Sequence, residues 1–112
     1  MISDHNISEK ISKKDFLEKI KNFEDKDIEI TDHTLFRLNQ KQRKVYESGV
    51  LKDFIMRKTP IEIEKQENGN LAVLYYYEED RIIKILIDLS PNKIYIVTFY
   101  ILSKRQMRGV GK

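Results

Sequence analysis

The sequence predicts an α+β domain in which N-terminal helices pack on a four-stranded antiparallel sheet. Apolar residues over 16–23 recur at helical spacing. From residue 61 onward the spacing changes to two, which is typical of strands. A length of 112 residues leaves room for one hydrophobic core. We therefore expect a flexible N-terminus over residues 1–11, a single domain over residues 12–102 and a basic C-terminal tail over residues 103–112.

Capping residues and helix breakers divide the first half of the chain into three helices. Ser12 is expected to cap the first helix, because a serine side chain accepts hydrogen bonds from the free N–H groups of a first turn. Thr31 or Asp32 can cap the second helix in the same way. The third helix is expected to begin at Val50, after a Ser-Gly interruption, and to end before Pro60.

The second half of the chain reads as four strands, at residues 61–64, 71–77, 81–89 and 94–102. Asn68-Gly69 predicts a hairpin between the first two, because both residues tolerate positive φ. A two-residue turn places Ile61 and Ile63 on the face of the even-numbered residues, whereas a three-residue loop with a bulge places them on the odd-numbered face. We favour the bulged register. Residues 28–30 also alternate and predict a short extended segment before the second helix.

The last two strands define the two faces of the predicted sheet. A short turn over residues 90–93 pairs them so that Lys84 lies opposite Thr98. The odd-numbered face is purely apolar and is expected to contact the helices; it carries Ile83, Ile85, Ile87, Tyr95, Val97 and Phe99. The even-numbered face carries Lys84, Asp88, Thr98 and Tyr100 among the apolar side chains Ile82, Leu86 and Ile96. We therefore expect the functional residues on the even-numbered face.

The residue inventory excludes several kinds of site. The chain has no cysteine, which excludes disulfides and thiolate metal ligands. The two histidines, His5 and His33, are too few for a histidine-rich metal site, and the four glycines form no phosphate-binding loop. No segment approaches the roughly 18 apolar residues of a membrane span, and none has the pattern of a signal peptide. We expect a cytoplasmic protein with no metal, cofactor or membrane partner.

Positive charge is concentrated in two blocks, although the net charge is only +3. Residues 33–58 contain seven basic residues against two acidic ones, and residues 89–112 contain five basic residues and no acidic one. The two blocks can meet in the fold as a surface that attracts phosphates, the alternative being a solvated lysine-rich surface. The candidate nucleic-acid-binding residues are Lys41, Arg43, Lys44, Arg81, Lys104 and Arg105.

His33 and Arg37 lie one helical turn apart at the start of the second helix, so they share one face. An imidazole beside a guanidinium near a helix start can hold a phosphate and take part in proton transfer. The alternative is that His33 caps or packs and that Arg37 is a solvated charge. For Lys84 and Thr98 the alternatives are a lysine that reaches from an apolar face to water and a threonine chosen for its strand propensity.

Three stretches follow one another in an order that is typical of a known superfamily. They are His33-Thr34-Leu35-Phe36-Arg37, Val50 to Ile55, and Ile96-Val97-Thr98-Phe99-Tyr100. With the strands between them, residues 28–102 resemble an uncharacterised branch of the RelE/ParE toxin superfamily. The chain departs from the pattern in having Lys41-Gln42 where that family usually has an arginine followed by glycine.

The resemblance implies a toxin-like protein of a toxin–antitoxin system, acting on mRNA as a metal-independent endoribonuclease. In such enzymes the RNA 2′-OH attacks the adjacent phosphate while basic and hydroxyl groups position the RNA and stabilise the developing charge. The resemblance implies His33 as the acid or base. Arg37 and Lys84 would clamp the phosphate, and Thr98 or Tyr100 would be the hydroxyl partner.

The implied partners are RNA, which in RelE-like members is ribosome-bound mRNA, and an antitoxin protein. Two alternatives stay open at this point. One is a non-catalytic module of the same fold that binds a protein or a nucleic acid. The other is a homodimer formed through exposed aromatic and aliphatic side chains of the even-numbered face.

Overall fold

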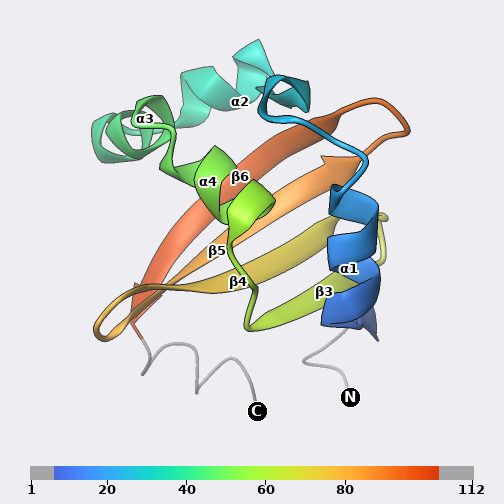
Figure 1. Ribbon diagram of the computed structural model, residues 1–112. Helices are drawn as coiled ribbons and strands as arrows, with labels where there is room; N and C mark the ends of the chain where they lie inside the picture. Colours follow the sequence, from blue (N-terminus) through green and yellow to red (C-terminus); the bar gives the residue numbers. More distant parts are fainter. Residues whose placement is uncertain (1–6, 104–112) are drawn as a thin grey trace.

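The computed structural model describes residues 7–103, which form one sheet with helices on one face and along one edge (Figure 1). Residues 1–6 and 104–112 lie outside the described part. In chain order the elements are β1 (Ile7–Ile11), α1 (Lys13–Ile20), the 3-10 helix η2 (Asp25–Asp27), β2 (Ile28–Ile30), α2 (Asp32–Arg37), α3 (Gln40–Glu47), α4 (Val50–Arg57), β3 (Glu62–Gln66), β4 (Leu71–Glu78), β5 (Arg81–Leu89) and β6 (Ile94–Ser103).

The expected four-stranded antiparallel sheet is wrong, because the sheet is mixed and wider. Its strand order is β1-β3-β4-β5-β6-β2, with one parallel pair, β2 and β6. The four expected strands form the centre, and two short strands from the first third of the chain flank them. The helices are therefore not simply N-terminal, since β1 precedes α1 and β2 separates α1 from α2.

The two flanking strands explain the difference from the prediction. Ile7–Ile11, which the sequence analysis assigned to the flexible N-terminus, pair with β3 as β1. The extended segment at Ile28–Ile30 pairs in parallel with Ile94–Ile96 of β6. Segments of five and three residues are too short for alternation to identify a strand, so only their distant partners define them.

Two ion pairs hold the region around β2 against the rest of the domain. The Arg57 guanidinium at the end of α4 donates hydrogen bonds to both carboxylate oxygens of Asp25, each at 3.0 Å. Lys93, directly before β6, donates to Glu29 of β2. The hydrogen bond that each cation donates to its carboxylate, Arg57 to Asp25 and Lys93 to Glu29, is the main reason that the pKa of Arg57 and of Lys93 is raised. Because these side chains are about half-exposed, each pair contributes little to the stability of the fold.

The helix boundaries follow the capping residues. The Ser12 hydroxyl accepts a hydrogen bond from the Asp15 N–H at 3.0 Å, which confirms the predicted start of the first helix. Of the two candidates for the second helix, Thr31 is the cap, and its hydroxyl accepts from the Thr34 N–H. The third expected helix is α4, which ends at Arg57, before the proline, as predicted.

The basic run 41–44 lies in a separate helix, α3, which the sequence analysis did not distinguish from its neighbour. Its cap is Asn39, whose side chain accepts a hydrogen bond from the Gln42 N–H while the Gln42 side chain accepts from the Asn39 N–H. This reciprocal pair starts α3 at Gln40, three residues after α2 ends at Arg37.

The hairpin between β3 and β4 has the bulged register that the sequence analysis favoured over the two-residue turn. Ile63 pairs with Val73, so Ile63 lies on the odd-numbered face and is buried in the core. Gln66 pairs with Asn70 across a three-residue loop whose last residue, Gly69, has φ 92°. A type I turn followed by a left-handed residue is the usual geometry of such loops.

A bulge in β6 shifts the register between the last two strands. Ile87 pairs with Ile96 but Leu86 pairs with Thr98, so Val97 is the extra residue. The predicted pairing of Lys84 with Thr98 is therefore wrong: Lys84 lies opposite Tyr100. Before the bulge the even-numbered residues of β6 face the core, and after it the odd-numbered residues do.

The core confirms that the odd-numbered face of β5 packs against helices. The β6 residues on this face differ from the prediction, because the bulge reverses which residues of β6 face the core. Ile94 and Ile96 are buried with Phe99, whereas Tyr95 and Val97, expected in the core, are only half-buried. In Figure 1, α1 and α4 lie over this face of the sheet, and α2 and α3 lie along β6. The buried helical side chains are Phe16, Ile20, Leu51, Phe54 and Ile55.

Replacing Gly69 tests the hairpin geometry. Its φ of 92° is strained for a residue with a Cβ, while no heavy atom lies within 4 Å of the added carbon. We expect Gly69→Ala to lower the free energy of unfolding by about 1 kcal/mol and Gly69→Asn to lower it less. Urea denaturation measures both, with Glu67→Ala in the same loop as control. Unchanged stability of Gly69→Ala would contradict the left-handed turn.

Replacing Tyr75 tests a buried polar group. The Tyr75 ring is almost fully buried beside Phe54, and its hydroxyl has no hydrogen-bond partner among the described residues. Tyr75→Phe removes this unsatisfied group and retains the ring, so we expect a gain of about 1 kcal/mol in the free energy of unfolding. Equal or lower stability of the variant at pH 7 would mean that the hydroxyl is satisfied.

The burial of Tyr75 also predicts that the free energy of unfolding falls at high pH. Burial raises the pKa of Tyr75 above its ordinary value of 10.0, so above that pH the unfolded chain loses this proton and the folded chain keeps it. The free energy of unfolding then falls by about 1.4 kcal/mol per pH unit for this group. Urea titrations between pH 9 and 11 should show a shallower loss for Tyr75→Phe than for wild type, and no such change for the exposed control Tyr76→Phe.

Candidate functional site

The candidate site lies along the edge of β6 that faces away from β5, in the part of β6 that does not pair with β2. β2 covers only Ile94–Ile96, and past this point α2 and α3 lie beside β6 instead of a strand (Figure 1). Two adjoining hollows open between these helices and β6. We call the first the His33 pocket and the second the α3 groove.

The His33 pocket has a volume of about 390 Å³. It is lined by His33, Thr34, Arg37, Leu38, Gln42, Val97, Thr98 and Tyr100. Four of the five predicted catalytic residues, His33, Arg37, Thr98 and Tyr100, therefore border one space. His33 and Arg37 reach it from successive turns of α2, and Thr98 and Tyr100 from alternate positions after the bulge.

Lys84, the fifth predicted residue, lies outside this lining. It is directly opposite Tyr100 on β5 and is half-buried on the same face of the sheet. Thr98 is its diagonal neighbour, since Thr98 pairs with Leu86. The expected cation and hydroxyl are therefore neighbours on one face, but the hydroxyl directly facing Lys84 is that of Tyr100.

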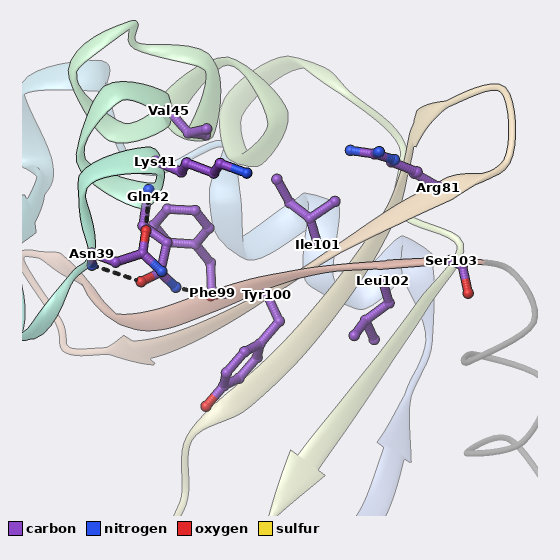
Figure 2. Close-up of a pocket in the computed structure, with 10 residues that line it drawn as sticks. All are labelled: Asn39, Lys41, Gln42, Val45, Arg81, Phe99, Tyr100, Ile101, Leu102 and Ser103. Carbon is purple, nitrogen blue, oxygen red and sulfur yellow. Dashed lines mark hydrogen bonds between the residues drawn. The ribbon is translucent and has the colours of Figure 1, made fainter.

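The α3 groove has a volume of about 570 Å³ and continues from the His33 pocket along β6. It is lined by Asn39, Lys41, Gln42, Val45, Arg81, Phe99, Tyr100, Ile101, Leu102 and Ser103. Figure 2 shows the Lys41 and Arg81 side chains extending from α3 and from β5 toward the space next to Ile101. Two of the predicted nucleic-acid-binding residues thus border this groove.

The other predicted nucleic-acid-binding residues are not brought to either hollow. The Arg43 guanidinium donates to the backbone carbonyls of Phe36 and Leu38, both at 3.4 Å, and so covers the C-terminal end of α2. Lys44 is exposed on α3 and borders neither hollow. Lys104 and Arg105 lie outside the described residues.

Gln42 connects the two hollows and was not singled out by the sequence analysis. Its side-chain amide donates to the Phe99 carbonyl of β6 at 3.0 Å while its oxygen takes part in the α3 cap (Figure 2). Gln42 and Tyr100 border both hollows. The sequence signal was the Asn39-x-x-Gln42 spacing of a capping box, which fixes the position of this side chain.

Phe36 is a second residue that the sequence analysis did not assign a role. Its side chain is 79% exposed, the most exposed large hydrophobic in the described residues. It lies three residues after His33 on α2, next to the face that borders the His33 pocket. On the even-numbered sheet face the exposed aromatics are Tyr76 (64%) and Tyr100 (47%), whereas Ile82 is buried. The exposed surface suggested for a homodimer is thus smaller than expected.

The electrostatic character of both hollows is cationic. No aspartate or glutamate is among the described residues that line either hollow. His33, Arg37 and Lys84 make no ion pair within the described part of the chain, and Arg81 has only a long, exposed contact of 3.8 Å with Glu78. Cations without carboxylate partners are available to bind an anion such as a phosphate group.

Between residues 7 and 103 no three histidine, cysteine or acidic side chains lie close enough together to hold a metal ion. None of the helices in this range is long and apolar enough to cross a bilayer. The side chains at and beside the His33 pocket offer an imidazole, a guanidinium, an ammonium and two hydroxyls.

Comparison with known proteins does not identify a family for this chain. No family model, no curated protein and no solved structure matches it. The resemblance to the RelE/ParE superfamily accordingly rests on the motifs described above and stays a prediction.

Proposed function

We propose that this protein is a toxin-like, metal-independent endoribonuclease whose active site is the His33 pocket. The observation that carries this proposal is the convergence of His33, Arg37, Thr98 and Tyr100 on one carboxylate-free space. These residues come from two elements far apart in sequence, and their chemistry matches what phosphodiester cleavage requires: a proton carrier, a fixed positive charge and hydroxyl donors.

The proposed reaction is an internal transfer of the phosphoryl group. The RNA 2′-oxygen forms a bond to phosphorus and loses its proton, the bond from phosphorus to the 5′-oxygen breaks, and the 5′-oxygen takes up a proton. His33 carries one of these protons, and Arg37 binds the non-bridging oxygens as their charge increases. Lys84 adds positive charge behind Tyr100, whose hydroxyl can donate to the same phosphate.

Phe36 suggests how the RNA is held beside the pocket. An aromatic side chain that is 79% exposed is costly to leave in water, and nucleic-acid-binding proteins use such rings as stacking surfaces for unpaired bases. Its position next to His33 on α2 would place a stacked base adjacent to the phosphate at the pocket. Lys41 and Arg81 in the α3 groove would then contact neighbouring phosphates.

A second candidate function is RNA binding without cleavage. It is favoured by the exposure of His33 and by the lack of a hydrogen-bond partner for its imidazole among the described residues. Catalytic histidines are usually oriented by a carboxylate or a carbonyl. In this case the same cations would hold the RNA, and loss of the imidazole would leave the affinity almost unchanged.

The cleavage test uses two substrates: an RNA oligonucleotide with EDTA present, and translating ribosomes in the magnesium buffer that they require. We expect a cleaved product that ends in a 2′,3′-cyclic phosphate, and no cleavage where a single 2′-deoxy nucleotide replaces the scissile one. His33→Ala should reduce the rate by about 100-fold or more, in the range of general acid–base catalysis. Lys58→Ala, which removes an exposed cation remote from the pocket, is the control.

Thermal unfolding of each variant separates chemistry from folding. His33, Arg37 and Lys58 are exposed, so their replacement should leave the melting temperature almost unchanged. Wild-type cleavage that is retained in His33→Ala would refute the assignment. If wild type binds RNA and does not cleave it, the second candidate function holds.

The binding test measures RNA affinity as a function of salt. We expect affinity for a single-stranded RNA dodecamer to fall steeply as salt rises, and Arg37→Ala to reduce the slope by about one charge. Phe36→Ala should weaken binding by about 1–3 kcal/mol, the usual value for one stacked base, with little change in the salt slope. Fluorescence anisotropy measures both, and an unchanged affinity in Phe36→Ala would rule out stacking on this ring.

A further inference from the structure

The α3 groove is the larger of the two hollows, and it has the size of a small-molecule site. Its volume of about 570 Å³ lies in the range of roughly 300–1,000 Å³ that is usual for ligand pockets. It opens along the part of β6 that follows Ile96, where no described strand pairs with the side of β6 that faces away from β5. Backbone groups on this side of β6 therefore face the groove.

Ile101 offers the groove one backbone donor and one backbone acceptor. The carbonyl of Phe99 points away from β5, because it accepts a hydrogen bond from Gln42. Alternate residues of a strand direct their backbone groups to the same side, so the N–H and C=O of Ile101 also point away from β5. The Phe99 carbonyl is occupied by Gln42, whereas no side chain between residues 7 and 103 hydrogen-bonds to the Ile101 backbone. A ligand that carries an acceptor beside a donor can satisfy both groups of Ile101.

The side chains around Ile101 are arranged for a flat ring that lies in the plane of the sheet. Neighbouring side chains of a strand point to opposite faces. In Figure 2, Ile101 extends to the same side of β6 as Val45, whereas Tyr100 and Leu102 extend to the other side. All four side chains border the groove. A planar group bonded to the Ile101 backbone would therefore have largely apolar side chains against both of its faces.

Two cations border the groove beside this backbone pair. Lys41 and Arg81 extend from α3 and from β5 toward the space next to Ile101 (Figure 2). Lys41 makes no ion pair within the described part of the chain, and Arg81 has only its long, exposed contact with Glu78. A phosphate monoester carries about two negative charges at neutral pH and accepts several hydrogen bonds, so it matches two such cations.

The backbone pair, the two apolar faces and the cations together match the chemistry of a nucleotide. A nucleobase is a flat ring with donors and acceptors on its edge, and adenine has a ring-nitrogen acceptor beside an exocyclic amine donor. A fatty acid has no such edge, and an inorganic anion has no apolar faces. We propose that the α3 groove binds one nucleotide, whose base hydrogen-bonds to the N–H and C=O of Ile101 and whose phosphate binds Lys41 and Arg81.

The nucleotide has two possible sources, a free nucleoside phosphate and one residue of an RNA. Gln42 and Tyr100 border both hollows, so an RNA residue in the α3 groove would lie next to the phosphate in the His33 pocket. This second source rests on the proposed function, whereas binding of a free nucleotide does not. The affinities of the two ligands distinguish the sources.

The test titrates adenosine monophosphate into the full-length, nitrogen-15-labelled protein and follows the backbone amides by NMR. We expect the Ile101 amide to shift, with a Kd of about 1 mM or below. Three control ligands each lack one feature: adenosine has no phosphate, ribose 5-phosphate has no base, and the analogue with a dimethylated exocyclic amine has no donor. We expect each to bind about tenfold more weakly or worse.

The variant Lys41→Ala/Arg81→Ala tests the phosphate contacts. It should weaken binding of adenosine monophosphate by about tenfold or more and leave binding of adenosine unchanged. Lys14→Ala, which removes an exposed cation on α1, is the matched control and should change neither. Equal loss of adenosine binding in the double variant would contradict a role of these cations in holding the phosphate.

A single-stranded RNA tetranucleotide separates the two sources. RNA is the source if it shifts the same Ile101 amide and binds about tenfold or more tightly than adenosine monophosphate; weaker RNA binding identifies a free nucleotide. Two results would overturn the proposal: no shift of the Ile101 amide with adenosine monophosphate at about 10 mM, or equal binding of ribose 5-phosphate, which would make the groove an anion site only. Cleavage at the His33 pocket is measured without this ligand, so the two proposals fail separately.

Discussion

The bulge at Val97 determines how the two ends of β6 are used. Before it, Ile94 and Ile96 are buried toward the helices and pair with β2. After it, the alternation is reversed, so Phe99 enters the core and Thr98 and Tyr100 turn to the opposite face. If residues 94–103 alternated regularly with no bulge, Thr98 and Tyr100 would face the core with Ile94 and Ile96, and Phe99 would face the opposite side.

The same strand changes its neighbour at the bulge. Its first residues pair with β2, which two carboxylate–cation pairs hold in place through η2 and α4. Its later residues lie beside α2 and α3, and a glutamine side chain takes over one position that a strand would have bound. Helix α2 starts directly after β2, so the end of β2 also fixes where His33 and Arg37 project.

Much of this arrangement could be predicted from local sequence. The caps Ser12 and Thr31 mark helix starts, and the left-handed Gly69 sets the β3–β4 register, because each acts within a few residues. The proximity of His33 to Arg37 follows from helical spacing alone. Their approach to Thr98 and Tyr100 was expected only from the resemblance to the RelE/ParE superfamily.

What could not be predicted depends on contacts between distant residues. β1 and β2 are too short to be recognised without their partner strands. The pairing of Lys84 with Thr98 was wrong because a turn-based register cannot include a bulge farther along the strand. The sequence does indicate the bulge: the apolar residues at 94, 96, 99 and 101 are spaced by two, three and two, and the spacing of three marks the extra residue. Gln42 was missed because its role joins a helix cap to a strand edge.

The parallel pairing of β2 with β6 has a consequence for how the chain folds. The strands from β3 to β6 each pair with the next strand in sequence, so they can form early. Ile28, in contrast, pairs with Ile94, from which most of the domain's sequence separates it. During synthesis the β2 segment leaves the ribosome long before its partner exists. β2 therefore cannot take its place in the sheet until β6 has been made, so closure of this edge is a late step of folding.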